Sequence, residues 1–190
     1  MSFQFPEGLA PEVYPLAWLV GSWRGPGFLA YANISERPIV VEATFSHDGG
    51  PYLAYTSTTW LLEGELAGLE TKVPQADLIA GDVWSTESGY WRIPPGGQGV
   101  TVNGEKAPRS ELEVLLADPS GHITVFVGAV QGPQITLVSD VIARTETGAE
   151  VSAAERQYGL VHGELMWATD MAAFGHEMAS YSAGRLERMS

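Results

Sequence analysis

The chain has 190 residues, of which 45% are hydrophobic and only 17% are charged, so we expect one compact domain over residues 1–190 rather than a disordered chain. Its 23 acidic residues outweigh its 10 basic residues and give a net charge of -13, which excludes binding of nucleic acid or an anionic membrane through a basic face. Because cysteine is absent, disulfides, thiolate metal sites and cysteine nucleophiles are excluded too.

The first predicted element is a short helix from Pro11 to Val20, which ends at Gly21. After it, 22 glycines and 12 prolines are spread along the sequence and divide it into pieces of strand length. Between these breaks, β-branched and aromatic residues predict eleven candidate strands, expected to give about ten real ones. They are 28–34, 38–46, 52–62, 87–93, 98–102, 111–117, 121–130, 133–143, 150–161, 164–173 and 177–188.

Short links such as Gln131-Gly132 and His162-Gly163 leave no room for a crossover helix, so neighbouring strands are expected to pair as antiparallel hairpins. A meander of this length hides its edges by closing, which predicts an all-β fold, an up-and-down β-barrel of the lipocalin or calycin kind. The N-terminal helix is expected to plug one end, and a barrel of this size leaves a ligand cavity. Residues 94–108 are predicted to form an exposed arm or insertion.

The segment after the helix has the pattern G-x-W-x-G-x-G, formed by Gly21, Trp23, Gly25 and Gly27. The glycines permit close backbone approach and the indole is large enough to cover a barrel end, so we interpret the motif as structural. A dinucleotide-binding interpretation fails, because the sequence that follows is strand-like and does not open a helix. Arg185 is expected to stack on the indole of Trp23.

This motif resembles the signature of the nitrobindin family, lipocalin-like barrels that are also similar to fatty-acid-binding proteins. The resemblance extends over about residues 12–189. Besides the G-x-W-x-G-x-G motif it rests on four segments: Phe45 to Tyr55, Glu87 to Arg92, Ala117 to Gly121, and Met171 to Gly175 followed by Arg185 to Arg188.

The family resemblance implies a ferric haem b held by one histidine of the last strand, with nitric oxide binding and isomerisation of peroxynitrite to nitrate. An ungapped match of the last two strands puts Tyr181 where the family carries that histidine. Asn33 likewise stands where the family has a threonine beside the haem, and the resemblance places Met171 in the pocket. Tyr181, Met171 and Asn33 are therefore the candidate ligand-binding residues.

The four histidines do not form a metal site by their spacing, and no catalytic residue is assigned. His176 lies five residues before Tyr181, which on a continuous strand would place the two side chains on opposite faces and ~16 Å apart. A tyrosine can ligate ferric haem as a phenolate, but only if its pKa is lowered far below about 10.

The function predicted first is binding of a small apolar ligand inside the barrel, with no stable haem and no other cofactor. The alternative is a ferric haem protein acting on nitrogen oxides, with Tyr181 or another residue as the iron ligand. A third possibility is an interaction module with a filled interior. Formation of a homodimer is a further possibility that the sequence does not decide. The acidic start lacks the basic region of a signal peptide, so a cytoplasmic protein is expected.

Overall fold

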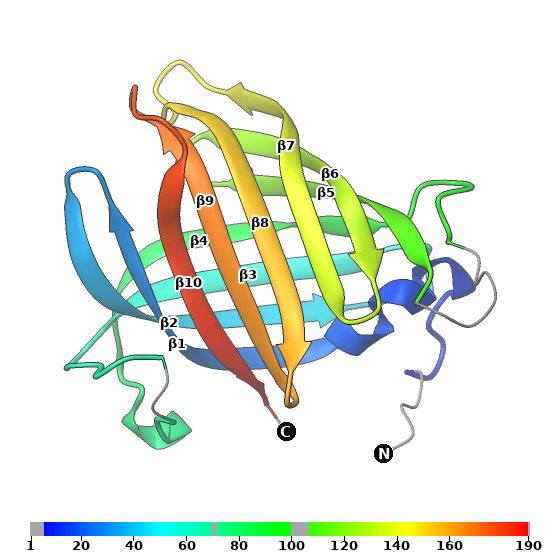
Figure 1. Cartoon of the computed structure of the whole chain (residues 1–190), viewed down its shortest axis with the longest axis horizontal. Helices are drawn as coiled ribbons and strands as arrows, with labels where there is room; N and C mark the ends of the chain where they lie inside the picture. The colour runs from blue at the N-terminus through cyan, green and yellow to red at the C-terminus, as the bar shows by residue number, and fades with distance from the viewer. Residues whose placement is uncertain (1–5, 70–71, 100–106, 190) are drawn as a thin grey trace.

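The computed structural model describes residues 6–69, 72–99 and 107–189. In this part of the chain ten antiparallel strands form a closed barrel, in which each strand pairs with its sequence neighbours and β1 closes against β10 (Figure 1). The predicted up-and-down barrel is therefore confirmed. The strands are β1 (Gly21–Tyr31), β2 (Ile34–Ser46), β3 (Leu53–Leu62), β4 (Ala80–Arg92), β5 (Arg109–Asp118), β6 (His122–Gln131), β7 (Gln134–Arg144), β8 (Val151–Val161), β9 (Glu164–Ala173) and β10 (Ala179–Arg188).

Two strands begin seven residues earlier than their sequence patterns predicted, and β2 and β5 begin four and two residues earlier. β1 starts at Gly21 instead of residue 28, because pairing with both β2 and β10 holds the glycine-rich stretch extended despite its low β-propensity. β4 starts at Ala80 instead of residue 87, and two register shifts against β3 disturb the alternation there. The strand predicted over 98–102 is absent at 98–99, and its remainder lies outside the described residues.

The N-terminal helix η1 (Pro11–Leu19) lies at one end of the barrel (Figure 1) and plugs it, as predicted. It is a 3-10 helix with Pro15 inside it, a residue that lacks the N–H needed to continue an α-helical ladder. Leu16 and Leu19 are fully buried in one core with Trp23 of β1. The Trp23 indole donates a hydrogen bond to the Leu19 carbonyl at 2.7 Å, which fixes the helix to the first strand.

The cation over Trp23 is Arg188 and not the predicted Arg185. The Arg188 guanidinium lies 4.1 Å from the centre of the Trp23 ring and donates to the carbonyls of Trp18 and Val20. A register shift in β10 changes which residues face inward, so Arg188 shares the inner face with buried Leu186. Arg185 lies on the other face of the strand and is 3.5 Å from Glu164.

Backbone contact is close where β1 meets β10, as it also is at Gly89 between β4 and β5 and at Gly128 between β6 and β7, and glycine makes it possible. A Cβ atom at Gly25 would overlap the carbonyl oxygen of Arg185. A Cβ at Gly27 would lie 2.6 Å from the Ala183 carbonyl oxygen, and one at Gly184 would lie 2.8 Å from the Pro26 carbonyl oxygen. The G-x-W-x-G-x-G motif therefore forms the closing seam of the barrel, which agrees with its structural interpretation.

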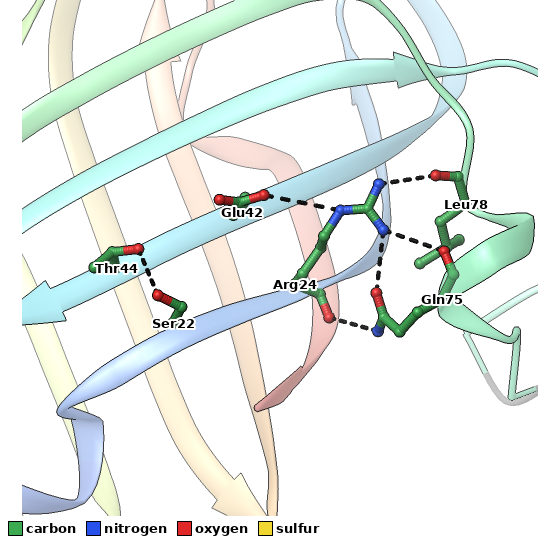
Figure 2. A network of polar contacts seen from close by, with 6 residues as sticks. All are labelled: Ser22, Arg24, Glu42, Thr44, Gln75 and Leu78. Carbon is green, nitrogen blue, oxygen red and sulfur yellow. Dashed lines mark hydrogen bonds and ion pairs between the residues drawn. The ribbon is translucent and has the colours of Figure 1, made fainter. Parts of the chain in front are cut away.

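The loop between β3 and β4, which contains the short helix η2 (Gln75–Asp77), folds back onto the outside of the barrel. Figure 2 shows the Arg24 guanidinium of β1 donating to the carbonyls of Gln75 and Leu78, while the Gln75 amide donates back to the Arg24 carbonyl at 2.9 Å. Glu42 lies 3.9 Å from Arg24. Leu78 and the outward-facing Val40 are both buried, so this part of the outer wall is covered.

The end of the barrel opposite η1 is formed by the turns after β1, β5, β7 and β9 and by the start of the loop after β3. Pairing between β7 and β8 covers only Gln134 to Val138 of β7, although β7 continues to Arg144. In the described part of the predicted 94–108 arm, Gln98 donates to the Pro11 carbonyl of η1, so these residues lie at the plugged end. Of the described helices, none has the length and apolar character to cross a bilayer.

Replacement of Gly25 by alanine is expected to lower the free energy of unfolding by about 2 to 3 kcal/mol, because the added methyl group forces the β1 and β10 backbones apart. Urea unfolding followed by circular dichroism measures the change. Gly159→Ala in β8 is the matched control, since its Cβ would find its nearest neighbour at 3.8 Å, and it should change stability by less than about 0.5 kcal/mol. Equal effects of the two substitutions would contradict the role of the seam.

Candidate functional site

A cavity of about 560 Å³ fills the part of the barrel away from η1 and reaches the turns at the opposite end. Its apolar wall includes Leu29, Val41 and Phe126. Polar side chains also line it, and they come from β3, β4, β5, β6, β8, β9 and β10. They include Ser57, Thr59, Glu87, Asp118, His122, Thr124, Arg156, Tyr158, Thr169 and Tyr181.

The strongest polar contact inside the barrel joins Glu87 of β4 to Arg156 of β8. Three strands separate β4 from β8 around the barrel, so this ion pair crosses the interior. Both guanidinium Nη atoms lie 2.7 Å from the two carboxylate oxygens, a bidentate geometry. Tyr55 donates a further bond to Glu87 at 2.8 Å, and the guanidinium lies 5.1 Å from the centre of the Phe126 ring.

Both members of this pair are charged at neutral pH. Burial alone would raise the pKa of Glu87, but the charge of Arg156 and the hydrogen bonds from Arg156 and Tyr55 outweigh burial and lower it. Burial would lower the pKa of Arg156, but the charge of Glu87 raises it well above its usual range. Burial, followed by the charge of Glu87, raises the pKa of the Tyr55 phenol, which therefore stays protonated.

Tyr181 enters the cavity from a register shift in β10 between Ser180 and Ser182. Its hydroxyl accepts a hydrogen bond of 2.7 Å from the indole N–H of Trp84, which reaches it from β4. Its ring meets Tyr31 edge to face, with centroids 6.2 Å apart. Burial raises the pKa of Tyr181, so the phenol is neutral and its own hydrogen remains available as a donor.

The structure brings two of the three predicted ligand-binding residues into the cavity. Half-buried Met171 lines it from β9 together with Tyr181. Asn33 instead lies exposed in the turn between β1 and β2 and does not line the cavity, whereas its neighbour Ile34 does. That turn closes directly between Tyr31 and Ile34, which leaves the Asn33 side chain outside the barrel.

One histidine, His122, lines the cavity, and it does so near the open end. Its Nδ1 is hydrogen-bonded to the Ser120 hydroxyl at 3.0 Å. His176 lies exposed in the turn before β10, where its ring contacts Tyr31 at 6.1 Å. Because His176 and Tyr181 both contact Tyr31, they lie closer together than a continuous strand predicted. In the ranges described, no cluster of three His, Cys, Asp or Glu residues could hold a metal ion.

Sequence reasoning missed the polar centre of the cavity, Glu87, Arg156 and Trp84. Glu87 stood within a quoted motif but was given no role. Arg156 carried a usable signal, since it lies between Ala154 and Tyr158 on the inward face of an alternating strand. A charged residue at an inward position requires a buried partner, and its partner lies 69 positions away in the sequence.

The cavity can therefore offer a ligand apolar walls, phenolic hydroxyls such as that of Tyr181, the internally neutralised pair of Glu87 and Arg156, and the carboxylate of Asp118 near the open end. The fold and this interior define a closed, lipocalin-like antiparallel barrel. Residues 12–188 match the family described as "THAP4-like, heme-binding beta-barrel domain". The chain belongs to this family, the nitrobindin-type barrels.

Relatives of known description agree with this membership. A "Ferric nitrobindin-like protein" of Beutenbergia cavernae is 59% identical, with 100% of both chains covered. Another of that description, from Kineococcus radiotolerans, is 42% identical over 93% of this chain and 92% of its own. A "Peroxynitrite isomerase" of Leifsonia xyli subsp. xyli is 34% identical over 97% and 98%. The crystal structure of Rv2717c from M. tuberculosis superimposes with a TM-score of 0.73 at 30% identity, covering 96% and 99%.

Arg156→Met should lower the free energy of unfolding by about 3 to 5 kcal/mol, because it leaves the charge of Glu87 buried without a partner. The double variant Glu87→Met with Arg156→Met should recover most of this loss. Urea unfolding of the wild type, both single variants and the double variant at pH 7 gives the coupling energy.

The coupling should also depend on pH. The folded pKa of Glu87 lies below its ordinary value of 4.5, so the stabilisation is fully present above that pH and disappears as the pH falls through the folded value. Additive single-variant effects at pH 7, or a coupling that grows on acidification, would contradict the assignment.

Proposed function

We propose that this barrel binds a small hydrophobic ligand in its interior and carries no stable haem. The observation that supports the proposal most is the cavity of about 560 Å³, a volume within the range of small-molecule sites. Its inner wall is largely apolar, and the charges of Glu87 and Arg156 are paired with each other. The further acidic side chain that lines it, Asp118, belongs to the last residue of β5 beside the open end, so the inner surface left for a ligand favours an uncharged, apolar molecule.

The chemistry of Tyr181 supports the absence of stable haem. By the family resemblance, this tyrosine stands where a histidine would ligate the iron. A phenol becomes an iron ligand as its phenolate, yet burial raises the pKa of Tyr181, and its oxygen already accepts a bond from Trp84. Arg185, the nearest arginine along the strand, lies beside Glu164 and does not stabilise a phenolate. The residues present therefore do not fit iron ligation through this position.

Binding of an apolar molecule can be tested with N-phenyl-1-naphthylamine, an uncharged probe whose fluorescence rises in apolar surroundings. We expect saturable binding of one probe per chain. Thr59→Phe, which places a ring in the cavity, should weaken binding at least tenfold. Thr58→Phe is the control, because this neighbour on β3 does not line the cavity. No saturable binding, or equal binding by both variants, would defeat the proposal.

A second candidate function is that of a ferric haem protein acting on peroxynitrite, because relatives carrying that name align over nearly the whole chain. His122 is the histidine that faces the cavity and is the alternative iron ligand to Tyr181. Stoichiometric haem binding that is lost in Tyr181→Phe or His122→Ala would favour this function over the first.

Haemin titration of the wild type should give no stoichiometric Soret band, whereas Tyr181→His should gain ferric haem binding, since an imidazole ligates iron without losing a proton. Tyr90→His on the outer face of β4 is the control and should gain none. Equal spectra for the wild type and Tyr181→His would contradict the importance of this position.

A further inference from the structure

The lining of the cavity changes along the barrel axis. Toward η1 its wall is formed by apolar side chains such as Ile39, Val41 and Phe45 of β2. At the open end the lining becomes polar and aromatic, and it includes Asp118 at the end of β5 and Trp84 in the first half of β4. A molecule that fills the cavity therefore meets a different environment at each of its two ends.

Asp118 supplies a carboxylate at the open end that has no cation beside it. Its Oδ1 accepts the backbone N–H of Ser120 at 2.6 Å, which holds the side chain in the turn after β5. Among the described residues, no ion pair joins Asp118 to a lysine, arginine or histidine. Arg156, the arginine inside the cavity, is bound through both Nη atoms to Glu87. The carboxylate of Asp118 is therefore left for a ligand.

Three aromatic side chains line the cavity at the same end. Trp84 and Tyr181 are joined by a hydrogen bond of 2.7 Å. Burial raises the pKa of Tyr181, the bond from Trp84 lowers it, and the charge of Asp118 raises it, so the carboxylate lies within electrostatic reach of the phenol. Phe174, in the turn after β9, lines the cavity although it is 56% exposed. We call Asp118 and these three aromatic residues the cavity mouth.

The backbone of Phe174 is held in a left-handed conformation, with φ at 53°. This conformation is unfavourable for a bulky residue, and strained positions of this kind cluster at ligand-binding sites. The chain thus keeps a large apolar ring exposed on the rim of the cavity at a cost in backbone energy.

The turns at the open end surround the mouth with further negative charge. The turns after β1, β5, β7 and β9 contain Glu146, Glu150 and Glu177 but no lysine or arginine. All three glutamates are exposed and none lines the cavity, so they contribute a field and not a contact. In a chain of net charge -13, this field attracts cations to the open end and repels anions from it.

We propose that the ligand of this barrel is an amphiphilic amine, with its apolar chain in the inner cavity and its ammonium group at the mouth beside Asp118. This assignment rests on the proposed function and adds a chemical class to it. A carboxylate binds an ammonium group through charge-assisted hydrogen bonds, and aromatic faces attract it through the ring quadrupole. An alkylamine is protonated at pH 7, because its pKa, like that of lysine, is about 10.4. The inner surface then meets only hydrocarbon.

The test compares three ligands that share a ten-carbon chain and differ in the charge of the head group: decylamine, 1-decanol and decanoate. Their affinities for the full chain are measured by displacement of N-phenyl-1-naphthylamine at pH 7 and about 0.15 M salt, where the Debye length is about 8 Å and distant charges are screened. We expect decylamine to bind at least tenfold more tightly than 1-decanol, and decanoate to bind more weakly than 1-decanol.

Asp118→Asn removes the charge and keeps the turn, because the asparagine Oδ1 also accepts the Ser120 N–H. It should reduce the preference for decylamine over 1-decanol to less than threefold and leave the affinity for 1-decanol unchanged. Glu146→Gln is the matched control, since it removes one negative charge from the same end of the barrel but outside the cavity, and it should keep the preference. Circular dichroism checks that both variants fold.

The outcomes separate the ligand class from the proposed function itself. A wild type that binds 1-decanol as tightly as decylamine would overturn the amine assignment and leave apolar binding in the barrel intact. A preference that survives in Asp118→Asn, or that Glu146→Gln reduces equally, would also overturn it, by tracing the preference to the overall charge of the chain. If neither the three ligands nor N-phenyl-1-naphthylamine bound, the proposed function would fail and the assignment with it.

Discussion

The close approach of β1 and β10 is the constraint on which the rest of the structure depends. A barrel closes only if its first and last strands can pair, and here that pairing requires positions without a Cβ atom, at Gly25, Gly27 and Gly184. The same seam carries Trp23, which links the plugging helix to the wall, and Arg188, which covers the indole. Closure, the plugged end and the hollow at the other end are thus consequences of one set of backbone contacts.

Within the hollow, the pair of Glu87 and Arg156 decides what kind of chemistry the site can perform. A lone arginine in an apolar cavity would attract anions, and a lone carboxylate would attract metal ions or act as a base. Paired at 2.7 Å through both oxygens, the two charges cancel each other in the middle of the cavity, and Asp118 adds a carboxylate near its open end. The neutral phenol of Tyr181 adds a donor without adding charge.

The fold could be predicted from the sequence because its signals are local: turns rich in glycine and proline, alternation along β5 and β7, and links too short for a crossover. The site could be predicted only in part. The family motifs predicted that Met171 and Tyr181 line the cavity. Whether the side chain of Asn33 faces the cavity or the solvent depends on the tight turn between β1 and β2, which the motifs do not reveal. Arg188 and not Arg185 stacks on Trp23, because the register shift in β10 reverses which residues of the strand face inward. No rule based on sequence spacing reveals such a shift. The partner of Arg156 is fixed only by barrel closure.

The short pairing between β7 and β8 has a mechanical consequence. Beyond Val138 the two strands continue without ladder hydrogen bonds to each other, while the neighbouring wall strands β6 and β9 are paired along their length. Spreading the cylinder at this place breaks no backbone bonds, whereas spreading it at the seam would break many. Local opening of the wall at this place therefore breaks few backbone hydrogen bonds, as does opening between β4 and β5, whose pairing covers only Ser88 to Arg92 of β4.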